Sequence, residues 1–214
     1  MRKAPGYLAL LGGLAVLVGA LGPWIPHQAV GLRVSGFDLF EMARIFPPVR
    51  AGAIRVAYGA FVLPLLLSAL AFALAPVLDR ALPTFLRWLC PALGVVLALT
   101  ALPPYPAILT AYRDPTYRGR FYTTAGAALL AAAAPLLRRL PRGLAGGGLL
   151  VLTVVGSAWP LVQYGRLRPL FEPLYGQPLG VGWGVIAHLV GAALLLLAGA
   201  VALWPSRHPD EDAV

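Results

Sequence analysis

LGVGWGVIAHLVGAALLLLAGAVALW, residues Leu179–Trp204, is the last long apolar run of this chain. It contains no Asp, Glu, Lys or Arg over 26 positions. An uncharged run of this length is too long for a buried helix of a small soluble domain. About 20 apolar residues, each rising ~1.5 Å along a helix, cross the ~30 Å hydrocarbon core of a bilayer. Trp183 and Trp204 stand near its two ends, where interfacial aromatic residues are expected. The run therefore predicts a transmembrane helix.

The composition of the whole chain agrees with a membrane protein. Of the 214 residues, 59% are apolar and 12% are charged, and the mean hydropathy is +0.79, which excludes an ordinary soluble domain. The net charge is +9, but the arginines are scattered between apolar segments. We therefore expect anionic lipid of the bilayer, and no nucleic acid, as the partner of these charges. The single cysteine, Cys90, allows no internal disulfide.

Six apolar segments predict an all-α integral membrane protein, a bundle of about six transmembrane helices. The expected spans cover about residues 7–24, 56–78, 85–102, 121–137, 143–162 and 179–204. Residues 1–204 are expected to form one bundle without a soluble domain, and residues 205–214 a short disordered cytoplasmic tail. The fourth span is rich in alanine, so we expect it in the centre of the bundle, where small residues let helices approach closely.

The first span has a second interpretation. Its basic start and apolar run also fit a signal peptide, with Val18-Gly19-Ala20 as the cleavage site. We expect an uncleaved span, with Arg2 and Lys3 holding the N-terminus in the cytoplasm.

A short helix is expected in the first outer connection, over about residues 36–46. Ser35 is its expected cap, with Asp38 reaching back to it, and two consecutive prolines end the helix. On a helical wheel Asp38, Glu41 and Arg44 share one strip, and apolar residues cover most of the remainder. We therefore expect this helix to lie in the membrane interface.

The arginine-rich connections favour one orientation. The totals of Lys and Arg are nearly even, with eight on the proposed inner side and nine on the proposed outer side. The inner connections are the shorter ones, and Arg138, Arg139 and Arg142 lie in one of them. Positive charges in short loops set the orientation, so we expect a multi-pass protein of the cell membrane (inner or plasma) with both termini cytoplasmic.

His188 is the sharpest single candidate for a functional residue. It lies five residues after Trp183, roughly 7.5 Å inside the interface, on a helix face rich in small residues. An ionisable residue within a span is a functional hypothesis by default. The alternative is a neutral imidazole that forms a hydrogen bond with Ser157, Thr153 or a backbone carbonyl.

Two further roles for His188, in a serine–histidine protease and as a haem ligand, fit the sequence poorly. Rhomboid intramembrane proteases also pair a serine with a later histidine, but here Gly156 directly precedes Ser157 instead of lying two positions before it, so the resemblance fails. Haem would need a second axial ligand, and His27 and His208 lie outside the spans. No Cys or His cluster has metal-ligand spacing, so we expect no cofactor.

A second candidate site is a group of charged residues in the outer loops. Arginine binds phosphate and carboxylate in a bidentate manner, so these loops have two interpretations, an anion pocket and a layer at the depth of the lipid headgroups. Glu41 and Arg44 are also spaced for a surface ion pair. Together with His188, the candidate ligand-binding residues are Arg113, Arg118, Arg120, Arg166, Arg168, Asp38 and Glu41.

Three functions follow as hypotheses. The first is a non-enzymatic subunit or accessory of a larger membrane complex, and other membrane subunits are then its partners. The second is a module that binds a small molecule or anion for transport and depends on a separate energy-coupling partner. The third is an enzyme acting on a lipid-linked anion, with Asp38 or Glu41 as base. In size and number of spans the chain resembles the substrate-capturing subunits of energy-coupling-factor transporters, without a shared motif.

Overall fold

The structure of the chain is a computed structural model that describes residues 4–27, 29, 31, 33–176 and 178–204. These residues form nine α-helices, short 3-10 turns and one two-stranded ribbon. The all-α fold class predicted from the sequence is confirmed. The predicted tail at 205–214 and the basic N-terminal residues lie outside the described residues.

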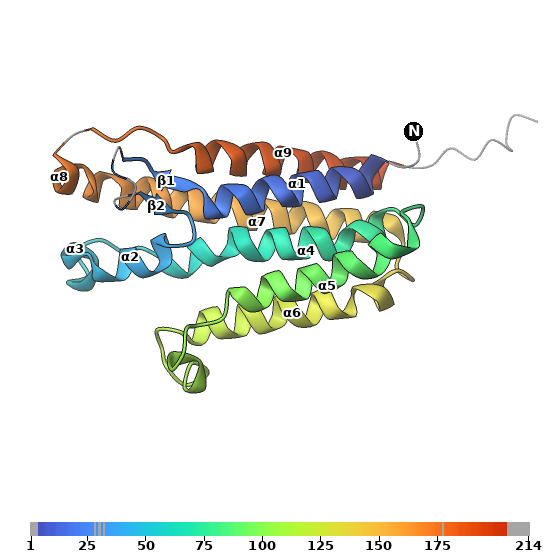
Figure 1. The fold of residues 1–214 in the computed structure, drawn as a ribbon, viewed down its shortest axis with the longest axis horizontal. Coiled ribbons are helices and arrows are strands. Elements are labelled where there is room, and N and C mark those ends of the chain that lie inside the picture. Colours follow the sequence, from blue (N-terminus) through green and yellow to red (C-terminus); the bar gives the residue numbers. More distant parts are fainter. Residues whose placement is uncertain (1–3, 28, 30, 32, 177, 205–214) are drawn as a thin grey trace, which may run out of the picture.

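Six long helices make up the body of the molecule, and consecutive ones run in opposite directions along its long axis (Figure 1). A 3-10 helix, Tyr58–Val62, leads directly into the second of them. The six are α1 (Ala4–Leu21), α4 (Leu63–Leu78), α5 (Thr84–Thr100), α6 (Arg118–Leu137), α7 (Arg142–Leu167) and α9 (Trp183–Leu203).

Several of these helices suit a membrane. Three are long and apolar enough to cross one: Tyr58–Leu78, Arg142–Leu170 and Trp183–Leu203. Two shorter apolar helices are Pro5–Leu21 and Thr84–Thr100. Large apolar side chains also point outwards, and those of Leu129 and Val151 are 72% and 64% exposed. Since soluble proteins avoid such surfaces, these helices indicate a membrane location.

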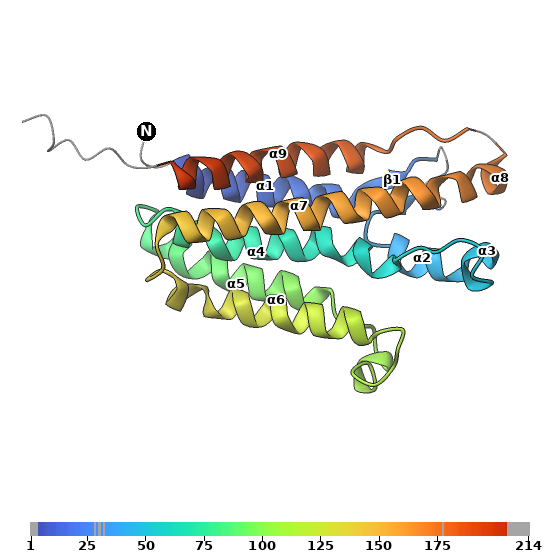
Figure 2. The same cartoon turned by 180° about the vertical axis from the view of Figure 1, so that it is seen from behind.

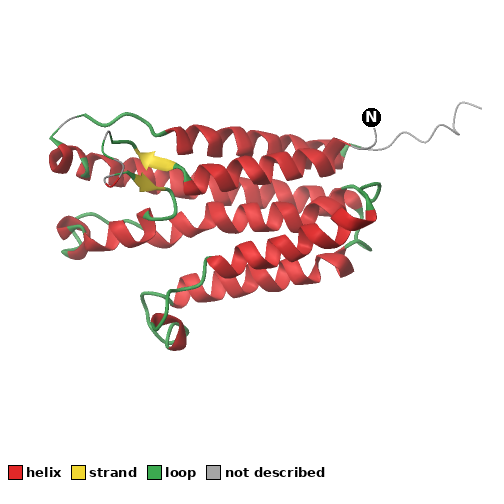
Figure 3. Ribbon diagram, in the orientation of Figure 1, coloured by secondary structure: helices red, strands yellow, loops and turns green. Residues whose placement is uncertain are grey.

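The short elements gather at one end of the bundle, together with the ribbon (Figure 3). They are α2 (Leu39–Ile45), α3 (Pro47–Arg50), α8 (Glu172–Tyr175) and the antiparallel strands β1 (Pro23–Ile25) and β2 (Val34–Ser35), with 3-10 turns at Ala107–Leu109 and Arg168–Leu170. The predicted interfacial helix exists but begins later than expected, because residues before Leu39 form a turn. In that turn the Ser35 hydroxyl donates to Asp38 Oδ2 (2.7 Å), and the Asp38 N–H donates to Ser35 Oγ (3.1 Å).

The helices α1 and α9 lie side by side in both views of the ribbon (Figures 1 and 2). Glycines make this approach possible. A Cβ added to Gly191 would lie 2.6 Å from the backbone N of Val16, and one added to Gly19 would lie 2.5 Å from the backbone N of His188. Close backbone approach at small residues is the usual mode of helix packing where water supplies no hydrophobic driving force.

The centre of the bundle is α4, and this corrects a prediction. Of its 16 residues, 14 are buried, whereas the alanine-rich α6 buries 6 of 20 and lies at the edge (Figure 2). The alanines of α6 face α4 and α5 on one side only, while Leu129 and Leu136 are each 72% exposed. Small residues therefore mark one packed face of α6 and not a central position. Cys90, on the neighbouring α5, is 2% exposed.

Candidate functional site

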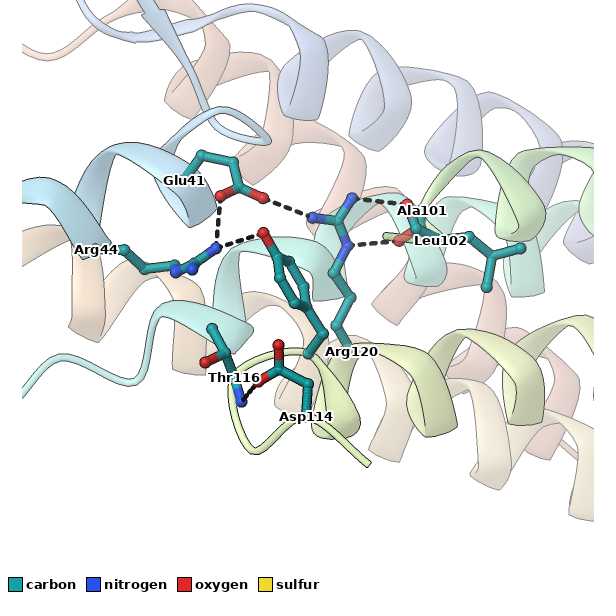
Figure 4. Close-up of polar contacts among 8 residues, drawn as sticks. Glu41, Arg44, Ala101, Leu102, Asp114, Thr116 and Arg120 are labelled. Carbon is teal, nitrogen blue, oxygen red and sulfur yellow. Dashed lines mark hydrogen bonds and ion pairs between the residues drawn. The ribbon is translucent and has the colours of Figure 1, made fainter. Parts of the chain in front are cut away.

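A polar cluster joins α2 to the start of α6 (Figure 4). Its carboxylate, Glu41, accepts hydrogen bonds at both oxygens. Arg44 Nη1 donates to Oε2 at 2.8 Å, and Arg120 Nη1 donates to Oε1 at 3.2 Å. Glu41 thus links two arginines that lie far apart in the sequence. The predicted pair of Glu41 and Arg44 is present, and Arg120 extends it across the fold.

Arg120 is the buried member of the cluster, with a side chain 5% exposed. Its Nε donates to the carbonyl of Ala101 (2.7 Å), and its Nη2 donates to that of Leu102 (3.1 Å). The guanidinium carbon also lies 4.6 Å from the centre of the Phe40 ring. Each of the three guanidinium nitrogens thus donates one hydrogen bond, so Arg120 holds the end of α5 against α2 and α6.

Arg44 is the more accessible of the two arginines. Its Nη1 donates to the hydroxyl of Tyr117 (2.8 Å), and its guanidinium carbon lies 4.7 Å from the centre of that ring. Burial by itself lowers the pKa of Arg44, but the hydrogen bond to Tyr117 and the charge of Glu41 outweigh it, so the net shift is upwards. Its side chain is 28% exposed, so a permanent positive charge faces outwards at this place.

Three cavities lie at this cluster and along the helices next to it. The first has a volume of about 290 Å³ and is lined by Glu41, Arg44, Ile45, Arg50 and Tyr117. The second has a volume of about 420 Å³ and shares no lining residue with the first. Its lining includes Phe40 and Thr116, the sequence neighbours of Glu41 and Tyr117, together with Tyr58, Arg120 and Trp159. The polar end of the path is therefore built by α2, α6 and the loop before α6.

The third cavity, of about 220 Å³, continues the path among apolar side chains of α4, α6 and α7. It shares Leu63, Thr123 and Val155 with the second cavity. We call these two cavities together the lateral groove. Its floor is α4, and its walls are α6 and α7.

The remaining predicted site residues do not join this cluster by any described contact. Asp38 is bound to Ser35, and the side chains of Arg113, Arg118 and Arg166 are exposed. Arg168 forms an ion pair with Glu172 (4.0 Å) and donates to the carbonyl of Leu179. Only Glu41 and Arg120 of the seven predicted outer residues therefore lie together.

Sequence reasoning missed the lateral groove. A signal for it exists in α6, where Gly119, Thr123, Gly126 and Leu130 recur at helical spacing on one face. A Cβ added to Gly119 or Gly126 would meet nothing within 4 Å. Such glycines serve no close helix contact, so they leave open space along the groove.

His188 is fully buried, and its ring centre lies 5.6 Å from that of Trp24. Neither ring nitrogen has a hydrogen-bond partner among the residues that the structure describes. Ser157 Oγ is also without a partner there, and Thr153 Oγ1 donates to the carbonyl of Leu149 at 2.7 Å. The burial expected for His188 is present, but the hydrogen bonds expected from Ser157 or Thr153 are not.

Comparison with known proteins leaves the function to be argued from this geometry. No protein-family model matches the chain, and no curated protein and no solved structure matches it. Within the described part of the chain, no group of three or more His, Cys, Asp or Glu residues is placed to hold a metal ion.

Proposed function

We propose that this chain is a six-span membrane protein with both termini in the cytoplasm, acting as a non-enzymatic subunit or accessory of a larger membrane complex. The observation that carries the proposal is the succession of six antiparallel long helices (Figure 1), along which many large apolar side chains are exposed. The proposed spans follow the predicted segments, from residues 7–24 to residues 179–204. Since α7 has 26 residues and is roughly 39 Å long, it also reaches beyond a ~30 Å hydrocarbon core.

The orientation is supported by the arginines at the end of the bundle away from α2 and α8. Arg80 Nη2 donates to the carbonyl of Arg138 (2.6 Å), and Arg138 donates to the carbonyl of Arg87. These bonds join the loop after α6 to the loop after α4 and to the first turn of α5. Positive charges in short loops favour the cytoplasmic side, where they also meet anionic lipid.

The rival hypotheses gain unequal support. An enzyme using Asp38 or Glu41 as base is disfavoured, because Asp38 is bound to Ser35 and both oxygens of Glu41 are bound by arginines. A module that binds an anion is the second candidate, favoured by the three cavities that begin at Arg44.

Purification at native expression levels tests the subunit hypothesis. The chain carries an affinity tag at its chromosomal copy, and the membrane is solubilised in a mild detergent. We expect the tagged chain to elute as a complex with at least one further membrane protein at a fixed ratio. A control purification from untagged cells identifies background proteins. Elution as a monodisperse single protein would exclude the subunit role.

A further inference from the structure

The three cavities differ in chemistry along their path. The outermost is lined by two arginines and one glutamate, and the innermost by apolar residues and a threonine. The middle one carries Tyr58, Thr116 and Arg120 beside apolar side chains. A path that is cationic at the membrane surface and apolar within the bundle matches a molecule with an anionic head and a hydrocarbon chain.

We propose that this path binds one anionic phospholipid of the surrounding leaflet, with its phosphate at Arg44 and Arg50 and an acyl chain in the lateral groove. The proposal rests on the membrane placement proposed above. It names the ligand class of the cluster and does not depend on a partner protein.

The polar end is suited to a phosphate. Arg120 is bound to Glu41 and to two carbonyls, so it balances the carboxylate from the buried side. Arg44 and Arg50 then give the outermost cavity an excess of positive charge. The guanidinium of Arg44 is held in place by Tyr117 and Glu41, so little side-chain freedom is lost when an anion binds. Charge-assisted bonds from a fixed fork to phosphate are among the strongest polar contacts.

The apolar end is suited to a hydrocarbon chain, because apolar side chains of α4, α6 and α7 make up most of its lining. Its two cavities have volumes of about 420 and 220 Å³. The open space beside Gly119 and Gly126 widens the groove where a chain would lie.

Native mass spectrometry of the full-length protein in detergent tests the proposal. Dioleoyl phosphatidylglycerol, phosphatidylcholine and dioleoylglycerol are added separately, and bound lipid is counted. We expect the anionic phosphatidylglycerol to bind most tightly and dioleoylglycerol, which lacks the phosphate, at least about tenfold more weakly. An excess of inorganic phosphate should not displace the lipid, because the acyl chain also contributes to binding. Equal binding of all three lipids, or full displacement by phosphate, would overturn the proposal.

Matched variants locate the site. Arg44→Gln combined with Arg50→Gln should weaken phosphatidylglycerol binding at least about tenfold, whereas Arg113→Gln, an exposed charge outside the three cavities, should not. Gly126→Leu fills the groove and should weaken binding of every lipid. Gly148→Leu is its control, because Gly148 is also open to a side chain and lines none of the three cavities.

Three outcomes separate this proposal from its rivals. Unchanged lipid binding in Gly126→Leu would overturn it. Loss of a co-purifying protein from Gly126→Leu, with lipid binding retained, would assign the groove to a partner helix and would also overturn it. Gly126→Leu is first checked for insertion into membranes with unchanged topology. A variant that does not insert tests the six-span arrangement and not lipid binding. If it does not insert, the arginine pair alone decides the proposal.

Discussion

His188 shows how a single buried side chain can reverse an expectation. A hydrogen-bonded histidine would tolerate Asn better than Leu. In the structure neither ring nitrogen has a partner among the described residues, and the buried ring lies beside that of Trp24. A buried polar group without a partner costs about 1–3 kcal/mol. We therefore expect His188→Leu to keep the free energy of unfolding within about 1 kcal/mol of the parent protein.

The matched change is His188→Asn, which places an amide in the same pocket. We expect it to be less stable than His188→Leu by about 1–2 kcal/mol. Thermal unfolding in detergent measures both. If Asn is tolerated and Leu is not, a polar partner for this imidazole exists, and its role as a ligand-binding residue gains support.

At the scale of elements, the crossing of α1 and α9 depends on glycine. A Cβ at Gly191 would meet backbone atoms of Val16 and Gly12, which cannot turn aside as a side chain can. Gly191→Ala should therefore separate the two helices and lower stability by about 1–3 kcal/mol. Gly148→Ala on α7 is the control, because its Cβ meets nothing, and alanine favours a helix over glycine by up to about 1 kcal/mol. Equal melting temperatures for the two variants would refute the close crossing.

The elements also show what the sequence can and cannot predict. Long apolar runs and the Ser35–Asp38 signal located the long helices and α2, because these patterns act within one segment. Neighbours of a helix depend on contacts between segments, so the alanine-rich run was wrongly expected at the centre. Only part of the cluster could be predicted, for the same reason. Glu41 and Arg44 are three residues apart, so their pairing follows from the sequence, whereas the pairing of Glu41 with Arg120 arises only from the fold.

The whole molecule has two chemically different ends, and its orientation can be tested. In a protein with Cys90 replaced by Ala, we introduce cysteine at Ala29, Thr110 or Pro178. All three are exposed and lie in the connections at the end of the bundle that carries α2 and α8. We expect each to react with an impermeant maleimide in intact cells, because these connections face outwards in the orientation proposed above. Cysteine at Pro141 should react only after the membrane is opened. The reverse pattern would invert the orientation, and equal labelling of all four sites would exclude a defined topology.

Cys90 gives the folded protein a built-in reporter of its own unfolding. It is the single thiol of the chain, and in the bundle its side chain is 2% exposed. A dye that fluoresces on reacting with thiols should stay dark until α5 leaves its neighbours, and the signal then rises once per molecule. Fluorescence against temperature would therefore follow the loosening of the α5–α6 edge without any introduced cysteine.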